Sequence, residues 1–128
     1  LRVAQDADNP GADAVTRLSS VIGRFAGWQA EHHRRARVIQ YELNALDRDH
    51  YRIITGLRRQ TTQVVRDVVD AGLESGEFTV PDAEGVTLAL MSLCVDICRW
   101  YPSGRYNEPE AISTLYADLA LRLVGAVR

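Results

Sequence analysis

The two segments nearest the C-terminus, 86–101 and 112–124, are apolar on two opposite sides, and no other feature limits the fold as strongly. At about 100° per residue, 86–101 has one face with Val86, Leu90, Leu93, Ile97 and Trp100 and another with Leu88, Met91, Val95 and Cys98. The segment 112–124 has Ile112, Leu115, Tyr116, Leu119 and Leu123 on one side and Ala117, Leu121 and Val124 on the other. A surface helix of a small monomer needs only one apolar stripe, so both segments must be covered twice.

A second copy of the chain is the simplest cover for the surplus apolar faces. A domain of about five helices has too few partner helices to bury both sides of both segments. We therefore expect a homodimer in which these segments and their twofold mates form a four-helix bundle. The interface candidates are Met91, Val95, Ile112, Leu115, Tyr116, Leu119 and Leu123. The alternative is that both helices lie at the centre of a monomer core, and which face of each meets the partner stays open.

Apolar residues at helical spacing also run through the segment 15–46. Gln29 and His32 occupy consecutive positions of this apolar seam, which predicts two helices with a break near 30–33. Asp47 is placed to cap a long helix, and we expect that helix to end at Ser75–Gly76, where glycine can adopt the left-handed conformation.

The remaining boundaries complete a helical pattern. Asp82 is expected to cap a helix that runs to Tyr101. The segment Asn107–Glu110 has a capping-box arrangement with a first-turn proline, and the last helix is expected to run to about Val127. Residues 1–11 are polar and contain a Pro-Gly breaker, as in a tail or linker. The sequence predicts an all-α fold of about five helices.

Composition excludes several classes of protein. With 46% apolar and 25% charged residues, the 128-residue chain is typical of one globular domain, which buries about two-thirds of its surface. All 15 basic residues are arginine, so a lysine Schiff base and a P-loop are excluded. The longest uncharged apolar stretch, 85–95, is too short to span a membrane, and a net charge of −2 gives no reason to expect nucleic acid on this chain itself.

No residue pattern indicates catalysis or metal binding. His32 and His33 are adjacent, so their side chains point about 100° apart and cannot chelate one metal ion. Cys94 and Cys98 lie one helical turn apart without a third ligand, as expected of buried free cysteines. Ser75 lacks the leading glycine of a nucleophile elbow. We expect no enzyme activity, metal or cofactor, and a cytoplasmic location because two cysteines make no disulfide framework.

Three short motifs occur in order along the chain. They are Glu42-Leu43-x-x-Leu46-Asp47 before the long helix, Gly72-x-x-x-Gly76-x-Phe78 at its end, and Arg99-Trp100-Tyr101-Pro102-x-Gly104. Their order and spacing resemble the C-terminal half of a TetR-family transcriptional regulator, from about Ala12 to the end. The chain resembles most the branch whose members respond to acyl-CoA-type ligands.

This resemblance implies that residues 12–128 form an effector-binding and dimerisation domain and that 1–11 form a linker. Members of this family begin with a helix-turn-helix domain, which this sequence lacks, so DNA contact is expected only through that N-terminal domain. The implied function is that of a ligand-responsive repressor. A small apolar or acyl-type effector would shift the dimer geometry and release DNA.

Effector sites in helical domains lie between helices and are mostly apolar, so we expect a pocket among the first four helices of the domain. The candidates are Phe25, Trp28, His32, Ile39, Tyr51, Ile54, Leu90, Ile97, Arg99 and Trp100. Arg99 could bind an effector carboxylate or phosphate, or simply pair with Asp96 one turn away. Glu42 could pair with Arg58 or Arg59.

Each candidate aromatic residue, taken singly, fits core packing better than a pocket wall. The alternative function of the chain is that of a helical adaptor that binds no ligand. A void lined by Trp28, Tyr51 and Trp100 would favour a sensor. A fully packed interior would favour the adaptor.

Overall fold

The computed structural model describes residues 2–42, 45 and 47–126. Over these residues the chain is helical and has no strand, and one isolated bridge joins Ser103 and Tyr106. The helices are α1 (Val3–Ala7), α2 (Ala14–Glu31), α3 (His33–Tyr41), α4 (Arg48–Ser75), α5 (Ala83–Val95), α6 (Ile97–Trp100) and α7 (Pro109–Leu123). The predicted all-α fold class is confirmed.

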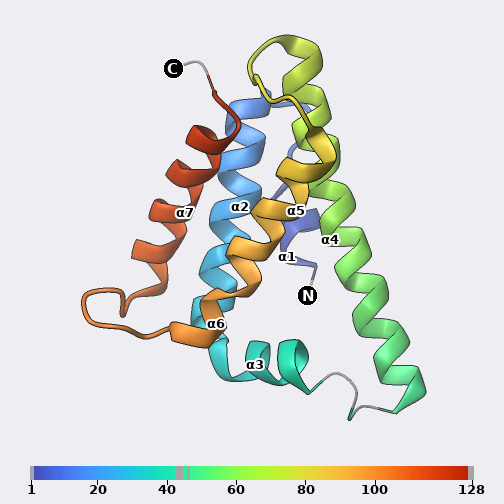
Figure 1. Ribbon diagram of the computed structural model, residues 1–128, viewed down its shortest axis with the longest axis vertical. Coiled ribbons are helices and arrows are strands. Elements are labelled where there is room, and N and C mark those ends of the chain that lie inside the picture. Colours follow the sequence, from blue (N-terminus) through green and yellow to red (C-terminus); the bar gives the residue numbers. More distant parts are fainter. Residues whose placement is uncertain (1, 43–44, 46, 127–128) are drawn as a thin grey trace.

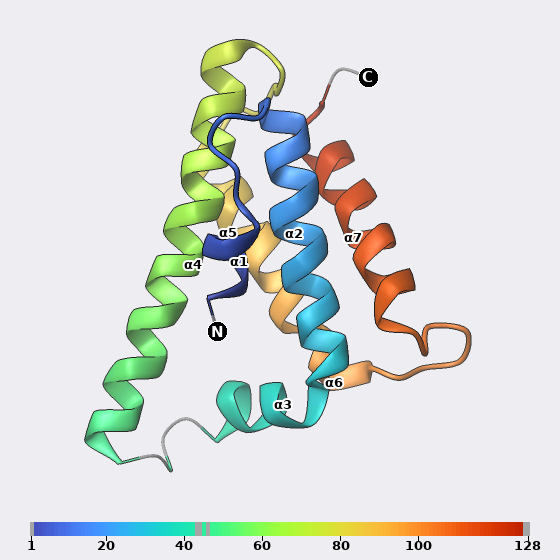
Figure 2. The same cartoon turned by 180° about the vertical axis from the view of Figure 1, so that it is seen from behind.

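Helix α2 occupies the centre of the bundle (Figure 1). It contacts α7 along one side more extensively than any other pair of helices in the described chain, and it also contacts α4 and α5. Figure 2, which shows the molecule from behind, has α1 in front, between α2 and α4. The short helices α3 and α6 contact each other at the end of the bundle opposite the C-terminus.

Two glycines allow α2 and α7 to pack closely. A Cβ atom added to Gly23 would lie 3.1 Å from the Ser113 hydroxyl oxygen, and one added to Gly27 would lie 3.3 Å from the Ser113 Cβ. Around this contact the core is formed by fully buried aliphatic side chains of α2, α4, α5, α6 and α7. They include Leu18, Val21, Ile22, Val65, Val68, Val69, Leu90, Ile97 and Ile112.

Several helices begin or end at the residues that the sequence predicts. The Asp47 and Asp82 carboxylates accept hydrogen bonds from the backbone N–H groups of His50 and Gly85, at 2.9 and 3.0 Å, so both predicted caps are confirmed. Helix α4 ends at Gly76, which has φ = +82°, also as predicted. The predicted break is confirmed too, since α2 ends at Glu31 and α3 begins at His33.

Three expectations differ from the structure. The helix expected to run to Tyr101 is interrupted at Asp96, where a turn separates α5 from α6. The expected capping box is wrong, because α7 begins at Pro109 and no side chain caps its N-terminus. That helix ends at Leu123, and Val127 lies outside the described residues.

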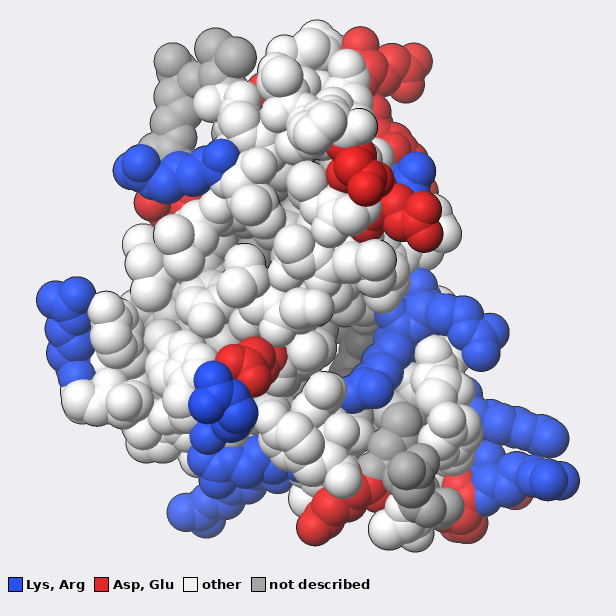
Figure 3. Space-filling view, viewed as in Figure 1, with Lys and Arg blue, Asp and Glu red and all other residues white. Residues whose placement is uncertain are grey.

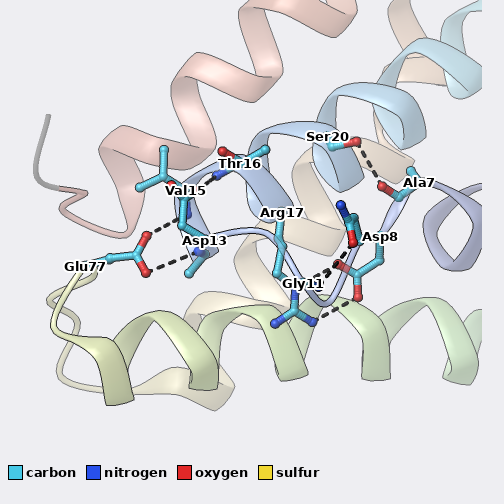
Figure 4. Close-up of polar contacts among 11 residues, drawn as sticks. Ala7, Asp8, Gly11, Asp13, Val15, Thr16, Arg17, Ser20 and Glu77 are labelled. Carbon is cyan, nitrogen blue, oxygen red and sulfur yellow. Dashed lines mark hydrogen bonds and ion pairs between the residues drawn. The ribbon is translucent and has the colours of Figure 1, made fainter.

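The N-terminal segment is fastened to the bundle, although its sequence reads as a tail (Figure 4). It forms α1, whose Ala4 side chain is buried. The Arg17 guanidinium donates two hydrogen bonds of 2.9 Å to the Asp8 carboxylate, and both side chains are only 12% exposed. The Ser20 hydroxyl donates to the Ala7 carbonyl. These contacts hold α1 on α2, because a largely buried charge of either sign needs its partner.

The end of α4 is joined to the start of α2 by Glu77. Its carboxylate accepts hydrogen bonds from the backbone N–H groups of Ala14 and Val15, at 3.2 and 3.0 Å. These bonds lower the pKa of Glu77, the Val15 N–H being the largest cause. Phe78 then folds back over Gly72 and is 3% exposed.

Replacing Gly72 with alanine is expected to destabilise the fold, because the new Cβ would overlap the Phe78 ring. We expect the free energy of unfolding to fall by about 1–3 kcal/mol in urea denaturation. Gly56→Ala is the matched control on the same helix, since a Cβ there has no neighbour within 4 Å. It should raise the free energy of unfolding by up to about 1 kcal/mol. Equal effects of the two substitutions would contradict the packing of Phe78 on Gly72.

Candidate ligand-binding site

A cavity of about 230 Å³ lies among the first five helices. Its walls come from Val3 of α1, Phe25, Trp28 and Gln29 of α2, Ala36, Ile39 and Gln40 of α3, Ile54, Leu57, Arg58, Thr61 and Thr62 of α4, and Met91 and Val95 of α5. Figure 3 shows the surface hollowed between α4 and α5, with basic side chains beside the hollow. The cavity is mostly apolar, with a few polar groups on the α2, α3 and α4 walls.

The break after α2 creates this space. Because the chain turns at His32, α3 leaves the axis of α2 and closes one end of the bundle (Figure 1). Helix α4 has 28 residues and is about 42 Å long, whereas α5 has 13 residues. The first half of α4 therefore extends past α5 and faces α3 across the cavity.

The polar groups of the walls differ in how they are satisfied. The hydroxyls of Thr61 and Thr62 donate to backbone carbonyls one turn earlier, at 3.1 and 2.9 Å. The Arg58 Nη2 group donates to Oε1 of Gln40 at 2.5 Å. The Gln29 side chain is 7% exposed and has no hydrogen-bond partner within the described chain. The Gln29 amide lines the cavity, so water or a ligand there can satisfy its hydrogen-bonding groups.

Four of the ten pocket candidates line the cavity, namely Phe25, Trp28, Ile39 and Ile54. His32 lies next to this wall and stacks on Trp28, with ring centroids 4.9 Å apart. Whether these residues bind a ligand stays a prediction.

The other candidates lie elsewhere. Leu90 and Ile97 are fully buried in the core. Tyr51 is 41% exposed near the start of α4, and Trp100 contacts Tyr101 and Tyr106 instead of the cavity. These residues are correctly placed on helices, but the directions of their side chains depend on how the helices cross.

Arg99 is also away from the cavity. It donates two hydrogen bonds, of 2.8 and 2.9 Å, to the Asp96 carboxylate. This pairing lowers the pKa of Asp96 and is the alternative that the spacing of the two residues allowed. The expected pair between Glu42 and Arg58 is replaced by the bond from Arg58 to Gln40. Leu43 and Leu46 of the motif at the end of α3 lie outside the described residues.

Sequence reasoning missed several wall residues. Met91 and Val95, named only as interface candidates from the sequence, line the cavity. Gln29 was noticed on the apolar seam and interpreted only as a sign of a helix break. The position of this polar residue among apolar ones was the signal that could have predicted a polar group facing a cavity. Nothing in the sequence pattern distinguishes Arg58 from its neighbour Arg59.

The remaining interface candidates lie on α7. Ile112 is fully buried inside its own chain and is therefore not available to a second copy. Leu115 and Tyr116 are half-buried, whereas Leu119 and Leu123 are 40% and 41% exposed. Helix α5 also has exposed apolar side chains at Leu93 and, on its α4 side beside the surface groove, at Leu88. We call the exposed side of α5 and α7 with Leu93, Leu119 and Leu123 the α5/α7 face.

Both cysteines are buried. Burial raises the pKa of the Cys94 thiol to about 12 and also raises that of Cys98, which suits neither a nucleophile nor a metal ligand. In the described ranges, no group of three His, Cys, Asp or Glu side chains is arranged to hold a metal ion. No helix among these residues combines the length and apolar character needed to cross a membrane.

An all-helical domain with an apolar cavity beside its central helix is the architecture of a TetR-type regulator's C-terminal domain. The chain belongs to the family of tetracyclin repressor-like C-terminal domains, whose model matches residues 11–124. This family is regulatory. Comparison with the curated proteins gives no match.

Solved structures agree with this assignment. A bacterial regulatory protein of the TetR family from Rhodococcus RHA1 is 40% identical, with 98% of this chain and 66% of that chain covered and a TM-score of 0.89. A TetR/AcrR-family transcriptional regulator from Thermobifida fusca YX-ER1 is 19% identical over 99% of this chain and 64% of its own, with a TM-score of 0.75.

The ketosteroid transcriptional regulator KstR2 of Mycobacterium tuberculosis is 20% identical, covers 98% of this chain and 64% of its own, and has a TM-score of 0.80. At this identity the likeness shows the fold alone. The present chain spans just under two thirds of the length of each of these three proteins.

Filling the cavity from its α3 wall is expected to stabilise the fold. Ala36 is 4% exposed and lines the cavity, so Ala36→Leu should raise the free energy of unfolding by about 0.5–2 kcal/mol in urea denaturation. Ala26→Leu is the control, because Ala26 is fully buried and is not a wall residue. Overpacking there should cost about 1–3 kcal/mol. A loss of stability in Ala36→Leu as large as in Ala26→Leu would mean that the space beside Ala36 is not free.

Proposed function

We propose that this chain is the effector-binding and dimerisation part of a ligand-responsive repressor of the TetR type. A small, largely apolar or acyl-type molecule binds in the cavity and biases the geometry of a homodimer. DNA binding belongs, in this proposal, to an N-terminal helix-turn-helix domain outside these 128 residues. The protein would act in the cytoplasm.

The cavity is the observation that carries the proposal. An engineered cavity of about 150 Å³ with apolar walls binds benzene, so 230 Å³ corresponds to a ligand of about nine carbon atoms. Aromatic and aliphatic walls with a few polar groups are typical of small-molecule sites. This void favours a sensor over a ligand-free adaptor, which needs a packed interior.

The α5/α7 face supports the dimer. Figure 3 shows a broad area over these helices with few charged side chains. Its three exposed leucines, between 40% and 44% exposed, would be removed from water by a second copy. A stable interface of this kind buries about 800 Å² per partner. Because the exposed residues lie on two neighbouring helices, a twofold mate would complete a four-helix bundle.

Helix α5 provides a physical link between ligand and dimer. Met91 and Val95 line the cavity, whereas Leu93 of the same helix is exposed on the α5/α7 face. A ligand that pushes on Met91 therefore changes the position of side chains that face the partner. The ligand acts only through its different affinity for the two dimer geometries. Val3 of α1 also lines the cavity, so the N-terminal segment can respond to the same ligand.

Ligand binding is tested with the two tryptophans, of which only Trp28 lines the cavity. We expect nonanol to change the tryptophan emission of the Trp100→Phe variant, because Trp28 is then the only fluorophore of its kind. The Trp28→Phe variant should show no change. Saturable binding is measured by fluorescence titration. An unchanged emission of the Trp100→Phe variant, or equal changes in both variants, would contradict a ligand site at this wall.

The dimer is tested by sedimentation. We expect the 14.3 kDa chain to sediment with twice this mass and the double variant Leu119→Glu/Leu123→Glu to sediment as a monomer. Both positions are already partly exposed, so charge there would block the interface without burial in the core.

The matched control is Val38→Glu/Ile53→Glu. These side chains are 44% and 58% exposed but lie on α3 and α4, away from the α5/α7 face. The control should remain a dimer. A wild-type monomer at high concentration, or a Leu119→Glu/Leu123→Glu variant of unchanged mass, would refute the proposed interface.

A further inference from the structure

Arg58 lies where the cavity meets an open basic groove on the surface. The groove runs between α4 and α5 and is lined by Arg58, Arg59, Arg66 and Glu84, among others. Arg58 and Thr62 line both the cavity and the groove. Figure 3 shows basic side chains beside the hollow between these two helices. A ligand that extends out of the apolar cavity at this point therefore meets positive charge.

Among the described residues, Arg58 has no acidic partner. Arg66 is paired with Asp70 at 3.1 Å. Across residues 2–42, 45 and 47–126, no carboxylate oxygen lies at ion-pair distance from Arg58 or Arg59. Arg58 is half-buried and its hydrogen-bond partner is the neutral amide of Gln40. A half-buried guanidinium with a neutral partner is stabilised when an anion binds, because charge-assisted hydrogen bonds are stronger than neutral ones.

Gln29 provides a second and independent sign of a polar ligand group. Its side chain is more than nine-tenths buried, lines the same cavity from α2 and has no partner in the described structure. An amide in this position offers two N–H donors and one carbonyl acceptor. A purely hydrocarbon ligand would leave these groups unsatisfied, whereas a ligand with oxygen atoms would not.

We propose that the effector is an amphipathic carboxylate, with an apolar body of about nine carbon atoms in the cavity and a carboxylate bound by Arg58. This inference rests on the proposed ligand-binding function and adds the chemical class of the ligand. The planar guanidinium of Arg58 donates to the two carboxylate oxygens as a fork. A single negative charge matches the single half-buried guanidinium, and further charge would have to be desolvated without a partner. Arg58 is then the residue that selects acids over neutral molecules of the same length.

The test compares nonanoate with nonanol at neutral pH by isothermal titration calorimetry. We expect nonanoate to bind about tenfold or more tightly to the wild-type chain, the difference that one charge-assisted interaction provides. Arg58→Gln should remove this preference, so that nonanoate and nonanol bind with about equal affinity. Arg59→Gln is the matched control, because Arg59 lines only the groove, and it should retain the preference. Inorganic phosphate alone should not bind.

A second variant keeps the inference testable if Arg58→Gln does not fold. Gln40→Glu places a carboxylate beside Arg58, where Gln40 now accepts its hydrogen bond. This internal anion should weaken nonanoate binding about tenfold without removing Arg58. Unchanged nonanoate affinity in Gln40→Glu would overturn the assignment.

The outcomes separate this inference from the function on which it rests. If nonanol binds the wild-type chain as tightly as nonanoate, the carboxylate class is wrong but the cavity remains a ligand site. If the preference for nonanoate is lost in Arg59→Gln and retained in Arg58→Gln, the assignment to Arg58 is wrong. If neither compound binds, both this inference and the proposed ligand-binding function fail.

Discussion

Close packing of α2 against α7 is the contact on which the rest of the domain depends. Gly23 and Gly27 leave room for Ser113, so the two helices lie together along most of the length of α2 (Figure 1). Helix α7 occupies one side of α2, and the opposite side of α2 faces α4 and α5. The large side chains of Phe25, Trp28 and Gln29 lie on that side, so α4 and α5 cannot approach α2 as closely as α7 does. The cavity is the space that remains. Its existence therefore follows from small residues on one side of α2 and large ones on another.

The same arrangement gives α5 two surfaces with different tasks. One surface lines the cavity through Met91 and Val95, and the other exposes Leu93 to solvent. A helix with a single apolar stripe could not connect an internal ligand to a partner subunit. In the proposed repressor, the unusual two-sided character of α5 is thus the physical basis of ligand response. The interruption at Asp96 ends this two-sided helix before the aromatic cluster of Trp100, Tyr101 and Tyr106.

Much of the fold could be predicted because its signals are local. Asp47, Asp82 and Gly76 act on backbone groups within a few residues, so spacing alone located these helix ends. The attachment of the N-terminal segment could not be predicted, for the opposite reason. The attachment of α1 needs Arg17 and neighbouring buried surface, which a polar segment of eleven residues does not reveal. The capping box at Asn107–Glu110 is wrong although its residues fit, because Glu108 and not Asn107 occupies the N-cap position of α7.

By itself, the sequence determined the helical class, most helix ends and the surplus of apolar surface on the last long helices, since each depends on periodicity or on neighbours within one turn. Only the tertiary structure decided which apolar side chains line the cavity, which are core and which remain exposed. Phe25 and Trp28 face the cavity while Leu90 and Ile97 do not, and Met91 faces it although its pattern fits an interface equally well. The physical reason is that a helix repeats its faces every few residues, whereas the neighbour of each face is set by how helices cross.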